Sequence, residues 1–256
     1  MPLIRLLREM AASISLLIQQ VFAARARFTK DLERYSIIRT VTAVERADVV
    51  VMVIDAAEGV AEQDAKIAGI AHERGKGVII AVNKWDAVEK DDKTIYKMTE
   101  KIKQTLAYMP YAEFVFISAK TGQRLDKLFE LIDMIIENQS MRIATGVLNE
   151  ILAEAVAMQQ PPSDKGRRLK IFYMTQISVK PPTFVVFVND KKLMHYSYTR
   201  YIENQIRNAF GFRGTPLRFI IRERRKISND TRIIAGDRIL SGNDPDRLSL
   251  WKNEGN

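Results

Sequence analysis

The stretch "GVIIAVNKWD", residues 77–86, decides the fold of this chain. Its apolar run from Val78 to Val82 has strand length and no polar alternation, which is typical of a strand buried on both faces. Three polar residues, Asn83, Lys84 and Asp86, follow where that strand would end. Open α/β sheets bind ligands outside the carboxyl ends of their strands, so the pattern predicts a site here.

Strands and helices alternate around this stretch. Further buried strands are predicted at 48–55 and 112–120, and helical spacing of apolar residues predicts helices at 31–47, 62–75, 92–109 and 124–139. Such alternation predicts a parallel sheet with helices on both faces. "GKG" at 75–77 is expected to stop a helix rather than to cradle a phosphate, and Asp55 to organise the loop that leads to Gly59.

The pattern changes near Arg142. The order becomes helix, strand, strand, helix, strand, predicted at 142–160, 167–179, 182–190, 195–210 and 216–224. This order predicts a small α+β domain. We therefore expect four segments: 1–30, an α/β domain at 31–141, an α+β domain at 142–226, and a poorly ordered tail at 227–256.

Composition narrows the function. The chain has 256 residues, two histidines and no cysteine, which excludes disulfides, thiolate metal sites and cysteine nucleophiles. The formal net charge is +9, so an anionic partner is expected. Residues 31–141 contain 15 Lys+Arg and 19 Asp+Glu, whereas residues 142–226 contain 16 and 6. The positive charge thus belongs to the second domain, which indicates that the two domains have different roles.

The polar residues after the central strand resemble the Asn-Lys-x-Asp group with which P-loop GTPases read guanine. Asp86 can accept the two donors of the guanine edge, Asn83 can donate to N7 and tie neighbouring loops together, and the stem of Lys84 can lie along the base. Backbone N–H donors for guanine O6 are expected from Ser118, Ala119 and Lys120. Asn and Asp are also common in ordinary turns at strand ends, and that alternative stays open here.

Longer stretches resemble one family. "ERYSIIRTVTAVERADVVVMVIDAAEGVAEQDAKIAGIAHERGKGVIIAVNKWDAV" and "LKIFYMTQISVKPPTFVVFVND" are similar to the ribosome-biogenesis GTPase family Der, also called EngA. The resemblance covers about 31–225. It implies a partial P-loop GTPase-type parallel sheet, the back of a second GTPase domain, followed by a small α+β KH-like domain. It further implies GTP or GDP as ligand, ribosomal RNA and the large (50S) ribosomal subunit as partners, and a cytoplasmic location without membrane or DNA partners.

The departures from that family matter. No G-x-x-x-x-G-K-[ST] occurs in the sequence, and no D-x-x-G precedes the matching region. Those elements cradle the phosphates and position Mg²⁺, so we expect Mg²⁺ only together with the missing amino-terminal part, no catalytic residue, and no GTPase turnover by this chain alone. The alternative is an RNA-binding or docking module whose GTPase scaffold is degenerate and independent of nucleotide.

Basic residues of the second domain are the candidates for contacts with RNA phosphates. They are Lys165, Arg167, Arg168, Lys170, Lys180, Arg213, Arg218, Arg222, Arg224 and Arg225. The alternative is a solvated basic face. "GFRG" at 211–214 resembles the G-x-x-G loop of KH domains, but it lies between a helix and a strand, so we expect a helix end and a turn there. The family likeness suggests contact either with ribosomal RNA or with the chain's own GTPase domain.

The first 30 residues match no part of the family. They predict either an amphipathic surface helix or the product of a frame shift. In the second case, the codons of Leu17 to Ala24 can be read one frame away as Asp-Thr-Ala-Gly-Ile-Arg-Arg, which is the D-x-x-G element placed at about the right distance. On that hypothesis residues 1–27 should be disordered or loosely helical, and the sheet should lack its first strands.

Overall fold

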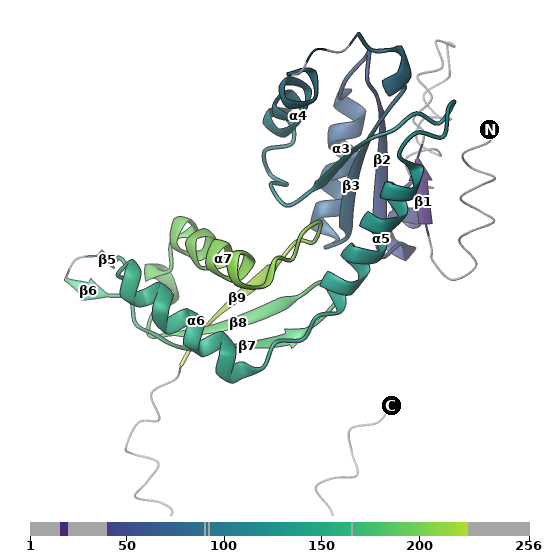
Figure 1. Cartoon of the computed structure of the whole chain (residues 1–256). Coiled ribbons are helices and arrows are strands. Elements are labelled where there is room, and N and C mark those ends of the chain that lie inside the picture. The colour runs from purple at the N-terminus through teal and green to yellow at the C-terminus, as the bar shows by residue number, and fades with distance from the viewer. Residues whose placement is uncertain (1–15, 20–39, 90, 92, 165, 225–256) are drawn as a thin grey trace, which may run out of the picture. The chain divides into compact units, whose positions relative to one another are not determined.

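The computed structural model describes residues 16–19, 40–89, 91, 93–164 and 166–224. A compact unit ends at Glu223, and the description below concerns that unit. Its first half is an α/β domain (Figure 1). Residues 40–46 are helical, and the elements that follow are β2 (Val49–Asp55), α3 (Glu62–Glu73), β3 (Gly77–Asn83), the 3₁₀ turn η1 (Trp85–Ala87), α4 (Thr94–Thr105), β4 (Glu113–Phe116) and α5 (Leu125–Ser140).

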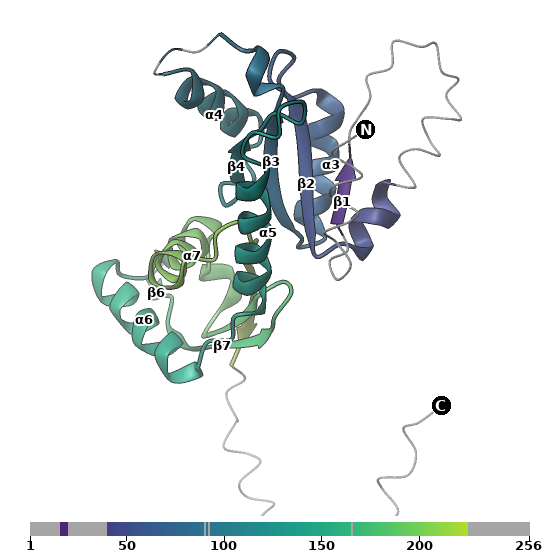
Figure 2. The same cartoon turned by 45° about the vertical axis from the view of Figure 1, so that its right-hand side comes forward.

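The strands of this half form one parallel sheet in the order β1-β2-β3-β4, in which β1 is Leu16–Gln19. Alternate residues of β2 and β3 enter two different cores: Val50 and Ile80 pack with α3 and α4, whereas Val51 and Ile79 pack with α5. The helices thus cover both faces of the sheet (Figure 2). This two-sided burial explains why both strands are apolar without alternation.

The structure differs from expectation at the amino-terminal edge. Residues Leu16–Gln19 form strand β1, which pairs in parallel with β2. The expectation that residues 1–27 form a helix, or lack regular structure, is therefore wrong for 16–19. The reason is that an edge strand presents unpaired N–H and C=O groups, and a short apolar run can pair with them. The rest of 1–30 and the whole predicted tail lie outside the described residues.

The second half is a small α+β domain. It contains α6 (Thr145–Met158), the short hairpin of β5 (Ser163–Asp164) and β6 (Arg167–Arg168), β7 (Ile171–Ser178), β8 (Thr183–Val188), the 3₁₀ turn η2 (Lys191–Leu193), α7 (Tyr196–Phe210) and β9 (Arg218–Glu223). In the sheet β7-β8-β9, β8 is antiparallel to β7 and parallel to β9. Side chains of α6 and α7 share one core with this sheet, and Leu148, Phe184 and Ile206 lie at its centre.

The two halves meet at the amino ends of the parallel strands. The N–H of Val78, at the start of β3, donates to the carbonyl of Gly214 over 2.9 Å, and the Gly214 N–H donates to the backbone carbonyl of Tyr111 over 2.9 Å. Arg213 forms two hydrogen bonds of 2.9 and 2.6 Å with Glu113, the first residue of β4. The "GFRG" segment is therefore the end of α7 and a turn, as predicted, and that turn contacts the first half of the chain.

Glycine is required where these backbones approach. Gly214 has a φ of +69°, and a Cβ atom there would lie 2.2 Å from Cδ1 of the buried Ile135. Gly75 has a φ of +73° and ends the turn after α3, as the sequence predicts, and a Cβ there would lie 2.6 Å from Pro181. Within the described residues, no helix is long and apolar enough to cross a membrane.

Candidate guanine site and candidate nucleic-acid interface

The carboxyl ends of β3 and β4 bring the predicted guanine-reading residues together. Asn83 ends β3 and is buried, and its side-chain oxygen accepts the Ala119 N–H over 2.9 Å. The Asn83 carbonyl accepts the N–H of Ala56, which follows β2. Asn83 thus ties together the loops after three neighbouring strands, as predicted. Its amide nitrogen has no hydrogen bond within the described residues, so it is the group left to donate to a ligand.

Lys84 is held by an acidic neighbour. Its backbone is left-handed, with φ of 62°, and its ammonium group lies 2.5 Å from the Asp55 carboxylate. Burial of Asp55 opposes ionisation, but Lys84 and the N–H groups of Ala57 and Glu58 outweigh it and hold the pKa of this carboxyl below its usual value. Asp55 therefore stays ionised and fixes the lysine head, while the stem of Lys84 remains exposed.

Asp86 lies one residue beyond a buried anchor. Trp85 is buried against Phe116, with ring centroids 4.6 Å apart, and the backbone N–H of Trp85 donates to the Ile117 carbonyl over 3.1 Å. Asp86 itself is exposed in the single 3₁₀ turn that follows. The anchor fixes the turn, so the carboxylate is presented at the end of the sheet.

The loop after β4 offers backbone donors. The buried Ser118 accepts the Thr121 N–H with its hydroxyl over 3.2 Å and is bridged to Gln123 through its own N–H. The Ala119 N–H is already paired with Asn83, whereas the Lys120 N–H has no acceptor among the described residues. The Lys120 N–H is therefore the group of this loop that is left to donate to guanine O6. The six predicted residues thus come from two adjacent loops and can address the edges of one planar base.

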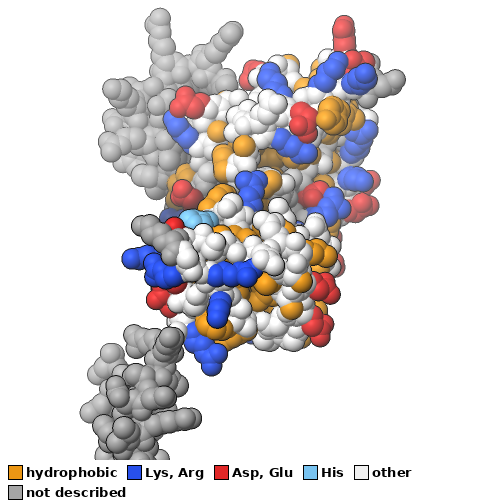
Figure 3. Space-filling view, turned by 90° about the vertical axis from the view of Figure 1, so that its left-hand side faces the viewer, with side chains coloured by type: hydrophobic (Ala, Val, Ile, Leu, Met, Phe, Trp, Pro, Cys, Tyr) orange, Lys and Arg blue, Asp and Glu red, His pale blue; other side chains and the backbone are white. Residues whose placement is uncertain are grey.

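The predicted phosphate-contact residues divide into two groups. Three of them contact the α/β half: Arg213 pairs with Glu113, Arg218 donates to the Glu73 carbonyl, and Lys180 lies 4.0 Å from Asp48. The others for which side chains are described, Arg167, Arg168, Lys170, Arg222 and Arg224, are exposed. Lys165 and Arg225 lie outside the described residues. In the space-filling view, Lys and Arg side chains are visible on both halves of the molecule (Figure 3).

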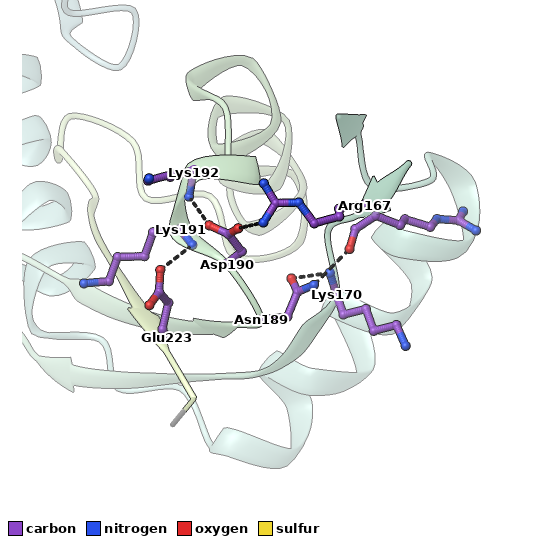
Figure 4. A network of polar contacts seen from close by, with 8 residues as sticks. Arg167, Lys170, Asn189, Asp190, Lys191, Lys192 and Glu223 are labelled. Atoms are coloured by element: carbon purple, nitrogen blue, oxygen red, sulfur yellow. Dashed lines mark hydrogen bonds and ion pairs between the residues drawn. The ribbon is translucent and has the colours of Figure 1, made fainter. Parts of the chain in front are cut away.

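A network of polar contacts holds one basic cluster in place (Figure 4). Asp190 accepts the Lys192 N–H over 2.9 Å and pairs with Arg167 over 3.2 Å, while Glu223 accepts the Lys191 N–H over 2.9 Å. Asn189 bonds to the backbone of Lys170. The acidic groups thus bind the backbone of the η2 turn, and the ammonium groups of Lys191 and Lys192 have no ion-pair partner within the described residues.

Sequence reasoning missed Lys191 and Lys192. The signal was present as "NDKKL" directly after a strand, where Asn and Asp predict a turn that exposes the following residues. No group of three or more metal-ligating side chains occurs within the described residues.

Two family models match consecutive parts of the chain. Residues 35–138 match "Elongation factor Tu GTP binding domain", and residues 142–222 match "KH-domain-like of EngA bacterial GTPase enzymes, C-terminal". These matches show an α/β domain of P-loop GTPase type followed by a KH-like domain, which confirms the predicted fold class.

Relatives identify the family more closely. GTPase Der of Agathobacter rectalis is 74% identical over 200 residues, which cover 78% of this chain and 45% of the relative. GTPase Der of Lachnospira eligens is 73% identical over 202 residues, which cover 79% of this chain and 46% of the relative. This chain belongs to the Der (EngA) GTPase family, and the resemblance seen in the sequence is confirmed. The chain spans less than half the length of these curated relatives.

Similarity to solved structures is lower. Era of Aquifex aeolicus bound to GDP·AlF₄⁻ is 18% identical and aligns with a TM-score of 0.37 over 77% of this chain and 73% of that chain.

Proposed function

We propose that this chain supplies the guanine-reading and RNA-facing parts of a GTPase that acts in assembly of the large ribosomal subunit. The hydrogen bond from Ala119 to Asn83 carries the proposal, because it joins the two loops that would read guanine into one site. GTP and GDP are the proposed ligands. The site residues are the six named above, and the domain limits predicted from the sequence, 31–141 and 142–226, are retained.

Nucleotide binding by this chain alone should be weak. The chain has the residues proposed to read the base, but the sequence contains no G-x-x-x-x-G-K-[ST] to hold the phosphates or to help hold Mg²⁺. A few net hydrogen bonds correspond to about millimolar affinity at best. When bound, Mg²⁺ would neutralise charge on the phosphates; the residues of this chain would only bind and orient the base. We expect GTP hydrolysis no faster than in a buffer blank.

The RNA-facing role rests on the charge of the KH-like half and on the exposed cations of that half. Phosphate contacts make binding strongly salt-dependent, because they release counterions. Between ~50 and ~200 mM salt, we expect the affinity for ribosomal RNA to fall by orders of magnitude. Arg213, Arg218 and Lys180 already contact the α/β half, so alanine there should weaken binding less than alanine at Arg222.

The test is co-sedimentation of the full chain with purified 50S and 30S subunits over a salt series. The proposal expects salt-sensitive retention with 50S particles and little with 30S. Retention that does not depend on salt would contradict phosphate contact. It would instead support the second candidate, a docking module with a nucleotide-independent scaffold, which the missing phosphate loop also favours.

A further inference from the structure

A cavity outside the guanine site lies where α7 meets the α/β half. Its volume is about 490 Å³, within the ~300–1,000 Å³ range of ligand sites. His72, Tyr108 and Tyr111 line it from the α/β half, and Tyr196, Arg200 and Asn204 line it from α7. The three α7 residues are spaced by four, so they lie on one face of the helix. Neither the guanine site nor the basic cluster of Figure 4 includes these residues.

The inner wall of the cavity is built of fixed rings. His72 stacks on Tyr111, with centroids 5.7 Å apart, and its Nδ1 lies 2.9 Å from the Tyr111 hydroxyl. The Arg207 guanidinium lies over the Tyr111 ring, 5.4 Å from its centroid, and is itself held by Glu203. Tyr108 is 40% exposed and is anchored by its hydroxyl to the Ala65 carbonyl over 2.6 Å. Rings that are already ordered lose little entropy when a flat ligand stacks on them.

The outer rim is aromatic and cationic. Tyr196 is 78% exposed, which leaves its ring available as a stacking surface. Arg200 is exposed and has no ion-pair partner within the described residues. The cations of Lys191 and Lys192 lie four to five residues ahead of Tyr196 along the chain, in the η2 turn that leads into α7. Aromatic platforms beside unpaired cations are the combination that binds single-stranded nucleic acid.

We propose that this cavity receives one unpaired base of a single-stranded RNA segment. The base stacks on Tyr196 and Tyr108, the Asn204 amide meets its polar edge, and Arg200 with Lys191 and Lys192 contacts the flanking phosphates. The proposal rests on the RNA-facing role proposed above and adds the location and the single-stranded specificity. Arg200 at the rim, together with Lys191 and Lys192 shortly before α7 in the chain, favours a polyanion over an aromatic side chain of a protein partner.

The test compares binding of a short labelled single-stranded RNA and of a duplex of the same sequence by fluorescence anisotropy. Base–aromatic stacking is worth ~1–3 kcal/mol, so Tyr196→Ala should weaken single-strand binding roughly 5- to 100-fold and duplex binding much less. Arg200→Ala should weaken it and reduce the salt slope by about one. Tyr96→Ala is the matched control, because Tyr96 is 69% exposed on α4 and does not line the cavity.

A second measurement separates stacking from an indirect effect. A single abasic nucleotide is placed at each position of the RNA in turn. At one position, where the missing base would have entered the cavity, it should weaken binding to the unchanged chain. At that same position it should not further weaken binding to Tyr196→Ala. If the chain binds RNA but Tyr196→Ala and Arg200→Ala bind as the unchanged chain does, the cavity is not the site. Equal losses on single strand and duplex would also overturn the inference. If the unchanged chain binds no RNA at all, the proposed function fails as well.

Discussion

The two ends of the parallel sheet are held in different ways. At the amino ends, β3 and β4 contact the KH-like half through backbone hydrogen bonds and through Gly214, whose Cα has no room for a side chain. At the carboxyl ends, Asn83 links loops whose polar side chains, such as Asp86, remain exposed. One end is thus closed by packing, and the other presents groups to a ligand. The KH-like half is thus attached without covering the guanine-reading loops.

The largest expected effect lies at the closed end. Gly214→Ala combines a left-handed backbone that disfavours alanine with a clash against the buried Ile135, so it should lower the free energy of unfolding by about 2–4 kcal/mol. Urea unfolding measures this. Gly146→Ala is the control: no atom lies within 4 Å of its added Cβ, Gly146 lies in α6, and the change should be neutral or stabilising by ~0.4–1 kcal/mol. Equal stability of the two variants would contradict a tightly packed amino end.

The two ends of the parallel sheet were not equally predictable from the sequence. The apolar runs around Val51 and Ile80 predicted β2 and β3, because burial on both faces leaves a pattern within each strand. The candidate guanine site was likewise predictable, since its residues follow directly after strands, in two short segments.

The contacts at the amino ends of the strands were not predictable, because they join residues that are far apart in the sequence. Gly75 and Gly214 read only as turn residues, and their contacts with Pro181 and Ile135 depend on how distant segments pack. The strand at Leu16–Gln19 was missed because four residues of a polar-interrupted segment carry no period. Lys191 and Lys192 were passed over in favour of basic residues beside longer strands.

A second prediction concerns the open end. Asp86→Asn removes the carboxylate that would accept both donors of guanine, and hydrogen bonds to charged groups are worth ~1.5–3 kcal/mol. The affinity for GDP should therefore fall about tenfold or more, measured by chemical-shift titration because binding is expected to be weak. Glu89→Gln is the control, since it neutralises another exposed carboxylate three residues away. The same loss in both variants, or none in either, would contradict base reading by Asp86.

A third, smaller effect sharpens the picture of the closed end. The Glu113 side chain is 16% exposed and receives two hydrogen bonds from Arg213, whose side chain is 61% exposed. A double-mutant cycle with alanine at both positions should give a coupling of about 0.5–1 kcal/mol in urea unfolding. The i,i+4 pair of Glu62 and Lys66 is the comparison, because both side chains are largely exposed, at 85% and 70%, and this pair should couple less strongly than Arg213 and Glu113. A coupling near zero for Arg213 and Glu113 would show that the closed end depends on backbone and apolar contacts alone.

The smallest effect concerns His72, beside the junction of the two halves. Burial lowers the pKa of His72; Glu203 and Glu73 oppose this shift, and Arg218 adds to it. The rings of Tyr108 and Tyr111 are its other close neighbours. Because the folded state takes up this proton less readily than the unfolded chain, the stability that neutral His72 contributes is present above the unfolded pKa of about 6.5 and is lost as the pH falls below it.

The urea midpoint of the unchanged chain should therefore drop between pH 7.5 and 5.5, and His72→Gln should show a smaller drop over the same range. His195→Gln is the matched control, because it makes the same replacement at an exposed histidine. If His72→Gln retains the full drop, the pH dependence arises elsewhere. The guanine-reading loops contain no histidine. A smaller drop for His72→Gln would therefore mean that protonation of His72 destabilises the amino ends of the strands without acting on those loops directly.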